Sequence, residues 1–186
     1  MMSFGHSQNT ENYYSLDNHN FPLHFERDFF LKINMKIDIL KTESHHKDFQ
    51  KLVRELDLYL AEIDGEDHSF YAQYNKLDAI KNCIIIYIDK EPIACGAYKK
   101  YDDQTIEVKR MFTKEQYRGK GYAKMVLLLL EKWAKEEGYN FSVLETGVQQ
   151  VSAVHLYEKS GYSRIPNYEP YENVENSICF LKQLVY

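Results

Sequence analysis

Hydrophobic residues recur along this chain with two different periods, and these periods predict where helices and strands lie. Over residues 47–63 the apolar positions return every three or four residues, as on one face of an amphipathic helix. A second helix is predicted over residues 121–137, apolar on most of its circumference and stopped by Gly138. A third helix is predicted over residues 151–159, where Gly161 closes it.

Strand-like patterns occupy the segments around these helices. Some alternate apolar and polar residues, as a half-buried strand does, whereas residues 83–88 form a continuous apolar run. Turn residues at 89–92 and 102–104 separate the middle three strands. The predicted strands are residues 35–42, 83–88, 93–98, 105–113, 141–144, 162–165 and 178–184. The order β, α, three β, α, β, α, β, β predicts a mixed α/β fold, a sheet with helices on its faces.

The first 34 residues are expected to be an N-terminal extension, because they show neither helical nor strand periodicity. They also lack the basic start and apolar core of a signal peptide. The domain is then residues 35–186, a common domain size. The alternative is that aromatic residues of the extension dock on the domain as a packing arm. These aromatic residues are Tyr13, Tyr14, Phe21, Phe25, Phe29 and Phe30.

The charge and the cysteines narrow the function classes. Lys and Arg number 23 against 28 Asp and Glu, a net charge of −5, so we expect no extended basic face for nucleic acid. The longest apolar run, residues 125–130, is too short to cross a bilayer, so we expect no membrane partner. The three cysteines are widely separated and fit neither a disulfide framework nor zinc spacing, and His45 and His46 are adjacent rather than metal-spaced. We therefore expect no metal site and a cytoplasmic location.

The segment most informative for function is residues 105–124, TIEVKRMFTKEQYRGKGYAK, in which a predicted strand leads through a glycine-bearing loop into a helix. Glycines let the backbone approach a ligand, and the first N–H groups of a helix bind anions, so this junction predicts a phosphate site. Arg118 and Lys120 add positive charge. The pattern is not a Walker loop, and it is not the GxGxxG of a Rossmann oxidoreductase, because Lys124 stands at the third glycine position.

Two motifs resemble those of the GNAT N-acetyltransferases. Residues 116–121, QYRGKG, match the Q/R-x-x-G-x-G/A pyrophosphate-binding motif of that family. Residues 150–162, QVSAVHLYEKSGY, resemble the family's N-x-x-A-x-x-L-Y-E-K-x-G-F/Y motif and depart from it only at Gln150. Residues 107–112 and 144–147 look like the family's fourth and fifth strands. The resemblance extends from residue 35 to the C-terminus and leaves out the extension.

The resemblance implies a central mixed, mostly antiparallel sheet flanked by helices, with an acetyl-CoA cleft between the diverging fourth and fifth strands. It implies direct transfer of an acetyl group from acetyl-CoA to a primary amine, with no covalent acyl-enzyme. Acetyl-CoA is then the cosubstrate, and no metal takes part. The residues implied to contact acetyl-CoA are Met111, Phe112, Thr113, Gln116, Arg118, Gly119, Lys120, Gly121, Tyr122, Ala123, Gln150, Ala153 and Tyr157.

Acetyl transfer to an amine also needs a base and an acid. A primary amine with a pKa near 10 must first lose a proton, and Glu107 and Glu145 are the candidate bases. Alternation places Glu107 on the same side of its strand as Lys109 and Met111. The alternative for either carboxylate is a salt bridge with Lys or Arg. Tyr157 stands where the family commonly places the acid for the leaving thiolate, and its alternative role is packing against the cosubstrate or the core.

The resemblance assigns further roles to the same strand. Main-chain groups of Met111 and Thr113 would pair with the pantetheine arm of the cosubstrate, and an N–H near Met111 would meet the oxyanion. Lys109 and Arg110 are expected to make salt bridges or to steer phosphate rather than to do chemistry.

The sequence gives the least information about the amine acceptor. The loop of residues 167–176 combines acidic and aromatic residues, which suits a cationic amine of a small molecule or a peptide. The alternative is a solvated acidic loop. These residues are Glu169, Glu172, Glu175, Tyr168 and Tyr171. The favoured function is an N-acetyltransferase, the alternative is a non-catalytic acyl-CoA-binding or sensor module, and the oligomeric state stays open, a homodimer included.

Overall fold

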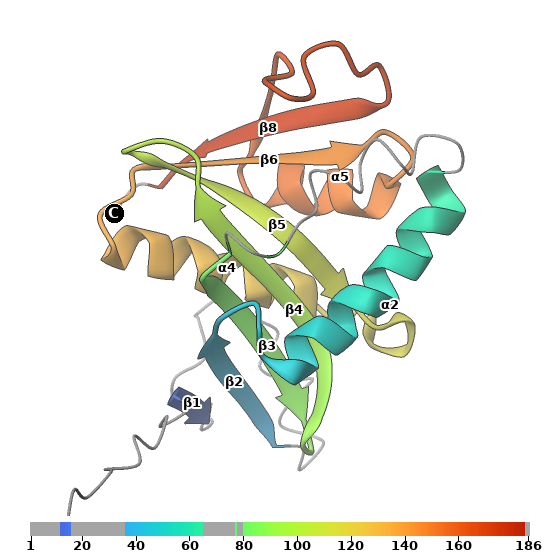
Figure 1. The fold of residues 1–186 in the computed structure, drawn as a ribbon, viewed down its shortest axis with the longest axis vertical. Helices are drawn as coiled ribbons and strands as arrows, with labels where there is room; N and C mark the ends of the chain where they lie inside the picture. The colour runs from blue at the N-terminus through green and yellow to red at the C-terminus, as the bar shows by residue number, and fades with distance from the viewer. Residues whose placement is uncertain (1–11, 16–35, 65–76, 78–79, 185–186) are drawn as a thin grey trace, which may run out of the picture.

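The computed structural model describes residues 12–15, 36–64, 77 and 80–184. Within them, eight strands form one sheet in the order β1-β2-β3-β4-β5-β6-β8-β7 (Figure 1). The strands are β1 (Asn12–Ser15), β2 (Ile37–Thr42), β3 (Asn82–Ile88), β4 (Glu91–Lys100), β5 (Thr105–Thr113), β6 (Phe141–Gly147), β7 (Ser163–Ile165) and β8 (Ser177–Gln183). The helices are α2 (Lys47–Asp64), α4 (Tyr122–Glu136) and α5 (Val151–Lys159), with a 3-10 turn η2 (Glu115–Tyr117) before α4.

The sheet is mixed and mostly antiparallel, which confirms the predicted fold class. Every neighbouring pair of strands is antiparallel except β5 and β6, which run parallel. The elements predicted from residue 35 onward have the predicted type and order, with small differences at their ends. β6 continues past residue 144 to Gly147 because its last residues pair with β8. β4 begins at Glu91, inside the predicted turn, and Pro92 lies where the register of β3 and β4 shifts.

One strand was not expected. Residues 12–15 lie in the segment predicted to lack strands, yet they form β1, which pairs antiparallel with β2 from Asn12 opposite Lys41 to Ser15 opposite Asp38. An edge strand offers unpaired main-chain groups, so a short segment can pair with it without any pattern of side chains. The remaining aromatic residues of the predicted arm lie outside the described residues. The division into an extension of residues 1–34 and a domain of residues 35–186 stays a prediction.

The sheet has helices on both faces, with α2 on one face and α4 and α5 on the other (Figure 1). The core on the α4 side includes Ile84 and Val126, and the core on the α2 side includes Phe49 and Cys95. Because both faces of β3 are covered, its sequence is continuously apolar rather than alternating. None of the helices in these ranges is long and apolar enough to cross a membrane.

β5 and β6 separate partway along their length. They pair only from Thr105 opposite Phe141 to Glu107 opposite Val143, although β5 continues to Thr113 and β6 to Gly147. Beyond Glu107, one edge of β5 therefore has no strand beside it in the described sheet. This separation confirms the predicted cleft between the family's fourth and fifth strands, which are β5 and β6 here.

β5 contains a β-bulge where it turns towards this cleft. The register with β4 passes from Ala97 opposite Lys109 to Cys95 opposite Phe112, so two residues of β5 oppose Gly96. Arg110, the first of these two, has a φ angle of 59°, in the left-handed region. The extra residue reverses the alternation of side chains along the rest of the strand.

The bulge corrects one prediction about the faces of β5. Glu107 and Lys109 share a face and an ion pair, as predicted. Met111 was expected on that face too, but it packs with the α4-side core together with Ile106 and Val108. The prediction was wrong because alternation carries a side chain to the same face every second residue only while the strand is regular.

Candidate active site

A cleft opens where β5 and β6 separate. Its walls come from these two strands, from α5, and from Leu56 and Leu60 of α2, and Tyr171 of the loop between β7 and β8 also lines it. The predicted site residues that line this cleft are Met111, Glu145, Gln150 and Tyr157. Glu107 is not among the lining residues. The fold therefore brings one candidate base and the candidate acid to the same cleft.

The loop before α4 has the geometry of an anion site. Gly119 and Gly121 have φ angles of 74° and 84°, which glycine adopts without steric strain. Gly121 is the N-cap of α4, and no side chain caps the helix, so its first N–H groups are available to a ligand. The positive end of the helix dipole favours an anion at the same place. These features fit the phosphates of a nucleotide cosubstrate.

Contacts within the protein hold both cations of this loop. Arg118 Nε donates to the main-chain oxygen of Thr113 at 3.0 Å, and its guanidinium lies 4.5 Å from the centre of the Tyr59 ring. Lys120 Nζ donates to the main-chain oxygen of Gln116 at 3.0 Å. Each cation therefore stays close to the loop, where it adds positive charge to the helix N-terminus.

The open edge of β5 supplies main-chain groups to the cleft. Lys114 N–H bonds to the Ile93 oxygen of β4 at 3.0 Å, which sets the direction of donors in this part of β5. Donors of successive residues point to opposite edges of a strand, so the N–H groups of Thr113 and Met111 face away from β4. Thr113 Oγ1 is buried and has no hydrogen-bond partner in the described structure.

Two of the residues predicted to contact the cosubstrate belong to the core. Phe112 is 8% exposed in the α2-side core, and Tyr122 is 1% exposed in the α4-side core. Phe112 also lines a surface hollow together with Gln116 and Arg118. Ala153 is half-buried and packs against the α4-side core.

Tyr157 projects from α5 and is 5% exposed. Its ring centre lies 5.9 Å from the ring centres of both Tyr162 and Phe180, which fix its orientation. Burial, followed by the negative charge of Glu145, raises the pKa of the Tyr157 hydroxyl above its ordinary range. The hydroxyl is therefore protonated at neutral pH, which is the form that can donate a proton.

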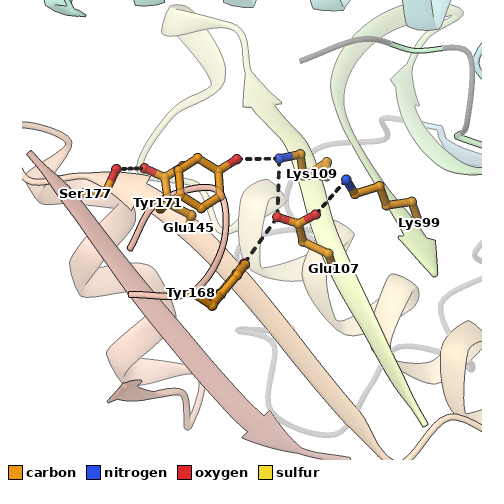
Figure 2. A network of polar contacts seen from close by, with 7 residues as sticks. All are labelled: Lys99, Glu107, Lys109, Glu145, Tyr168, Tyr171 and Ser177. Atoms are coloured by element: carbon orange, nitrogen blue, oxygen red, sulfur yellow. Dashed lines mark hydrogen bonds and ion pairs between the residues drawn. The ribbon is translucent and has the colours of Figure 1, made fainter. Parts of the chain in front are cut away.

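Glu145 lies near the end of β6, where that strand no longer pairs with β5. Ser177 Oγ donates to Glu145 Oε1 at 2.6 Å across the β6–β8 pair (Figure 2). This hydrogen bond orients the carboxylate, which is only half-buried and lines the cleft. Ser177 was not predicted, because nothing in the sequence links two residues that far apart.

Glu107 has the surroundings of a structural carboxylate. Its side chain is 4% exposed, with Oε2 at 3.0 Å from Lys99 Nζ and Oε1 at 3.3 Å from Lys109 Nζ (Figure 2). The Tyr168 hydroxyl donates to Oε1 at 3.2 Å. These contacts correspond to the salt-bridge alternative for Glu107. Glu145 is then the candidate base that lies in the cleft.

The loop of residues 167–176 is acidic outside and aromatic inside. Its three glutamates, Glu169, Glu172 and Glu175, are exposed, as in the solvated-loop alternative. Its tyrosines turn inward, and Tyr171 is 2% exposed and accepts a hydrogen bond from Lys109 Nζ at 2.9 Å (Figure 2). The loop therefore packs an aromatic ring, not a carboxylate, against the end of the cleft.

The salt bridges predicted for Lys109 and Arg110 are present. Lys109 pairs with Glu107, and Arg110 Nη2 lies 2.5 Å from Asp57 Oδ1 of α2. Burial lowers the pKa of Lys109, although the charge of Glu107 acts in the opposite direction.

Leu56 and Leu60 of α2 were predicted only as members of an apolar helix face. They lie one helical turn apart and line the cleft. The apolar periodicity located them correctly on one face, but the same pattern describes a residue that fills a core and one that lines a cleft.

The fold and this site define a class of α/β protein in which a helix with an uncapped N-terminus begins beside a sheet that splits between two parallel strands. A family model described as the acetyltransferase (GNAT) family matches residues 43–162, more than half of the chain. This protein therefore belongs to the acetyltransferase (GNAT) family.

Individual relatives agree with this family and match limited parts of the chain. The probable N-acetyltransferase family 8 member 5 of Mus musculus is 38% identical over 65 residues, which cover 35% of this chain and 29% of that relative. The match thus spans less than a third of that protein's length.

Two solved structures share the fold. An acyl-CoA N-acyltransferase of Klebsiella pneumoniae superposes with a TM-score of 0.66 at 24% identity, covering 79% of this chain and 97% of that one. A GNAT family acetyltransferase of Elizabethkingia anophelis with acetyl-CoA bound has a TM-score of 0.60 at 19% identity, covering 79% and 97%.

Proposed function

We propose that this protein transfers an acetyl group from acetyl-CoA to the primary amine of a small molecule or a peptide, in one step within a ternary complex. The observation that carries the proposal is the cleft between β5 and β6, which brings Glu145 and Tyr157 to the open edge of β5. Membership of the acetyltransferase (GNAT) family supports it. The structure with acetyl-CoA bound among the similar folds supports acetyl-CoA as the cosubstrate.

The residues present fit acetyl-CoA, which supplies the acetyl group as a thioester. The loop from Arg118 to Gly121 and the first N–H groups of α4 would hold the pyrophosphate. The N–H groups of Met111 and Thr113 would pair with the pantetheine arm, much as an extended peptide pairs with the exposed edge of a sheet. The N–H group nearest the bulge, that of Met111, would meet the oxyanion, where one such donor contributes roughly 3 kcal/mol.

Glu145 would act as the base of the reaction. An ammonium group has no free electron pair, so the acceptor must lose a proton before its nitrogen can attack a carbonyl carbon. The Glu145 carboxylate would take this proton directly or through one water, with Ser177 holding it in place. Glu107 is a weaker candidate, because two lysines already neutralise it outside the cleft.

Tyr157 would act as the acid. Bond cleavage leaves negative charge on the sulfur, and a protonated hydroxyl beside it can supply the proton that makes it a thiol. The raised pKa of Tyr157 keeps that proton on the hydroxyl until the thiolate forms. The nearby charge of Glu145 contributes to the same shift, so the two groups are electrostatically coupled.

The cellular setting is proposed on separate grounds. Cys83, Cys95 and Cys179 are all buried free thiols, and this usage is typical of a reducing compartment such as the cytoplasm. Residues 35–186 would form the acetyltransferase domain, with residues 1–34 as an extension.

Two measurements test the proposed function. Acetyl-CoA and CoA should raise the melting temperature, because a ligand at 100 times its Kd stabilises the folded state by about 2.7 kcal/mol, whereas NAD should not. A panel of amines, amino acids, polyamines and peptides is then assayed for CoA release. Stabilisation by NAD instead of acetyl-CoA would contradict the cosubstrate. Binding of acetyl-CoA with no CoA release by any amine would favour the non-catalytic binding module.

A further inference from the structure

The loop of residues 167–176 is tied to β5 by two side-chain contacts. The Tyr168 hydroxyl donates to Glu107 Oε1 at 3.2 Å, and Lys109 Nζ donates to the Tyr171 hydroxyl at 2.9 Å (Figure 2). The Lys109 ammonium also lies 5.5 Å from the centre of the Tyr171 ring. Because Glu107 and Lys109 pair with each other on β5, the two contacts attach the loop to one buried ion pair.

The same loop is closed by hydrogen bonds of its own. Asn167 Nδ2 donates to the main-chain oxygens of Val174 and Ser177, at 3.0 and 3.1 Å. Three main-chain hydrogen bonds, of 2.6, 2.9 and 3.2 Å, join Tyr168 to Ser177 in steps of three residues. The contact that Tyr168 makes with β5 is therefore connected to the position of Ser177.

Ser177 is the point where this loop reaches the cleft. Its Oγ donates to Glu145 Oε1 at 2.6 Å, and Glu145 lines the cleft. Ser177 pairs with Gly147 at the very end of the β6–β8 ladder, and the end of a ladder opens more easily than its middle, so the loop helps to hold it. A continuous series of contacts thus joins Glu107, outside the cleft, to Glu145, inside it (Figure 2).

We propose that Tyr168 is a positioning residue: by tying the loop to Glu107 it holds Ser177, and through Ser177 it orients the Glu145 carboxylate that takes the proton of the amine. This inference rests on the proposed acetyl transfer, in which Glu145 is the base. A misplacement of about 1 Å in a reacting group can lower a rate about 100-fold, so a contact away from the chemistry can affect it. Glu107 then serves the reaction as an anchor for the loop, without transferring a proton.

Hydrogen exchange of residues 167–177 tests the tie without any substrate. Tyr168→Phe removes the hydroxyl that binds Glu107 and keeps the ring, which packs against the rings of Tyr101 and Tyr171. We expect exchange in this segment to become about 5- to 10-fold faster, while exchange in β3 should not change. Tyr101→Phe is the matched control, because it removes a hydroxyl from the neighbouring ring and leaves the contact with Glu107 in place. Equal exchange in Tyr168→Phe and in the unaltered chain would overturn the tie.

The pH profile of kcat/KM tests the effect on the base. A hydrogen bond from Ser177 favours the charged form of Glu145, so weakening it should move the acidic limb to higher pH. We expect a move of about one to two pH units in Ser177→Ala, and of about half a unit in Tyr168→Phe. Both variants keep the other ionisable groups around this carboxylate. These groups include Lys109 of β5, Tyr157 of α5, Cys179 of β8 and Tyr171 of the loop.

The double variant decides whether Tyr168 acts through Ser177. If it does, Tyr168→Phe should lower kcat/KM by about 3- to 10-fold in the unaltered chain and by less than about twofold in the Ser177→Ala chain. Equal losses in both chains mean that Tyr168 only supports the fold, and they overturn the inference.

The outcomes distinguish this inference from the proposed function. CoA release by Tyr168→Phe with an unmoved acidic limb leaves the proposed function intact and overturns only the positioning role. If no amine releases CoA with the unaltered chain, the proposed function fails and the positioning role with it.

Discussion

The hydroxyl of Tyr157 carries its proton at neutral pH. Burial raises its pKa, and the charge of Glu145 adds to the shift, so the hydroxyl is not ionised at neutral pH. The aromatic rings of Tyr162 and Phe180 pack against the ring of Tyr157. These contacts are the same in a phenylalanine variant, which makes that variant a clean test.

Tyr157→Phe should lower kcat by about 10²- to 10⁴-fold, the contribution of a positioned acid. The ring contacts remain, so the melting temperature and the Kd of acetyl-CoA should stay close to those of the unaltered chain. CoA-release kinetics and calorimetric titration with acetyl-CoA measure the two effects. An unchanged kcat would remove Tyr157 from the mechanism and leave it a packing role.

Glu145→Gln should lower kcat/KM by about 10²- to 10⁴-fold and remove the acidic limb of its pH profile, because an amide cannot take the proton of the acceptor. The hydrogen bond from Ser177 can still reach the amide oxygen, so little stability should be lost. If the pH profile of kcat/KM keeps its acidic limb, Glu145 is not the base.

Glu107→Gln should instead act on stability. Neutralising this carboxylate leaves the buried Lys109 ammonium without its ion-pair partner, and breaking such a pair destabilises a protein by about 3–5 kcal/mol. Urea unfolding measures the change, and the acidic limb of the pH profile should remain. A stable variant that lacks this limb would restore Glu107 as the base.

A sequence motif indicated the position of two cleft residues, while their roles stay predictions. Tyr157 lies in the cleft as its motif implied, and so does Gln150. Alternation alone could not choose between Glu107 and Glu145. That choice depends on Lys99 and on the loop with Tyr168, and neither contact follows from local sequence.

At the scale of the element, the packing of α4 on the sheet depends on Gly96. A Cβ atom at this position would lie 2.5 Å from Met111 Sδ and 2.6 Å from Val126 Cγ1, closer than atoms can approach. Gly96 therefore lets α4 and the bulged part of β5 approach β4 together. Its absence of a side chain is a requirement of packing and not of backbone conformation.

Gly96→Ala should lower the free energy of unfolding by about 1–3 kcal/mol, the usual effect of overpacking. Displacement of Met111 should also weaken acetyl-CoA binding, because this residue belongs to the open edge of β5. Gly138→Ala is the control, since it has a φ angle of 92° but no atom within 4 Å, and it should lose stability without any change in the Kd of acetyl-CoA. Full stability of Gly96→Ala would contradict the close approach.

Element types were predictable because apolar periodicity reports burial directly. α2 was found from its three- and four-residue spacing, and β3 from its continuous apolar run. β1 was not predictable, because its pairing with β2 uses main-chain groups that every residue has. The bulge at Arg110 was not predicted either, because no residue type there requires a left-handed φ angle.

At the scale of the whole molecule, many of the tyrosines belong to the packing between layers. Burial raises the pKa of Tyr98, Tyr157 and Tyr162 above the ordinary value of 10. The unfolded chain releases these protons near pH 10, while the folded chain keeps them. The folded state thus binds more protons than the unfolded state at alkaline pH.

The free energy of unfolding should therefore keep its full value below about pH 10. Above that pH it should fall by about 1.4 kcal/mol per pH unit for each such tyrosine. Urea unfolding at about pH 8 and about pH 11 measures this loss. Tyr98→Phe should reduce the dependence on pH, because one of the contributing groups is removed. Equal stability at both pH values would show that these hydroxyls ionise as freely in the folded state as in the unfolded one.

The extra residue in β5 makes this strand sensitive to residue number as well as to residue identity. Deletion of Arg110, the residue between Lys109 and Met111, would restore regular alternation along the strand. Every later side chain of the strand would exchange the α2 side for the α4 side, and Met111 and Phe112 would leave their present cores. When segments of β5 are exchanged with those of a relative, they should therefore be aligned at the bulge and not at the first residue of the strand.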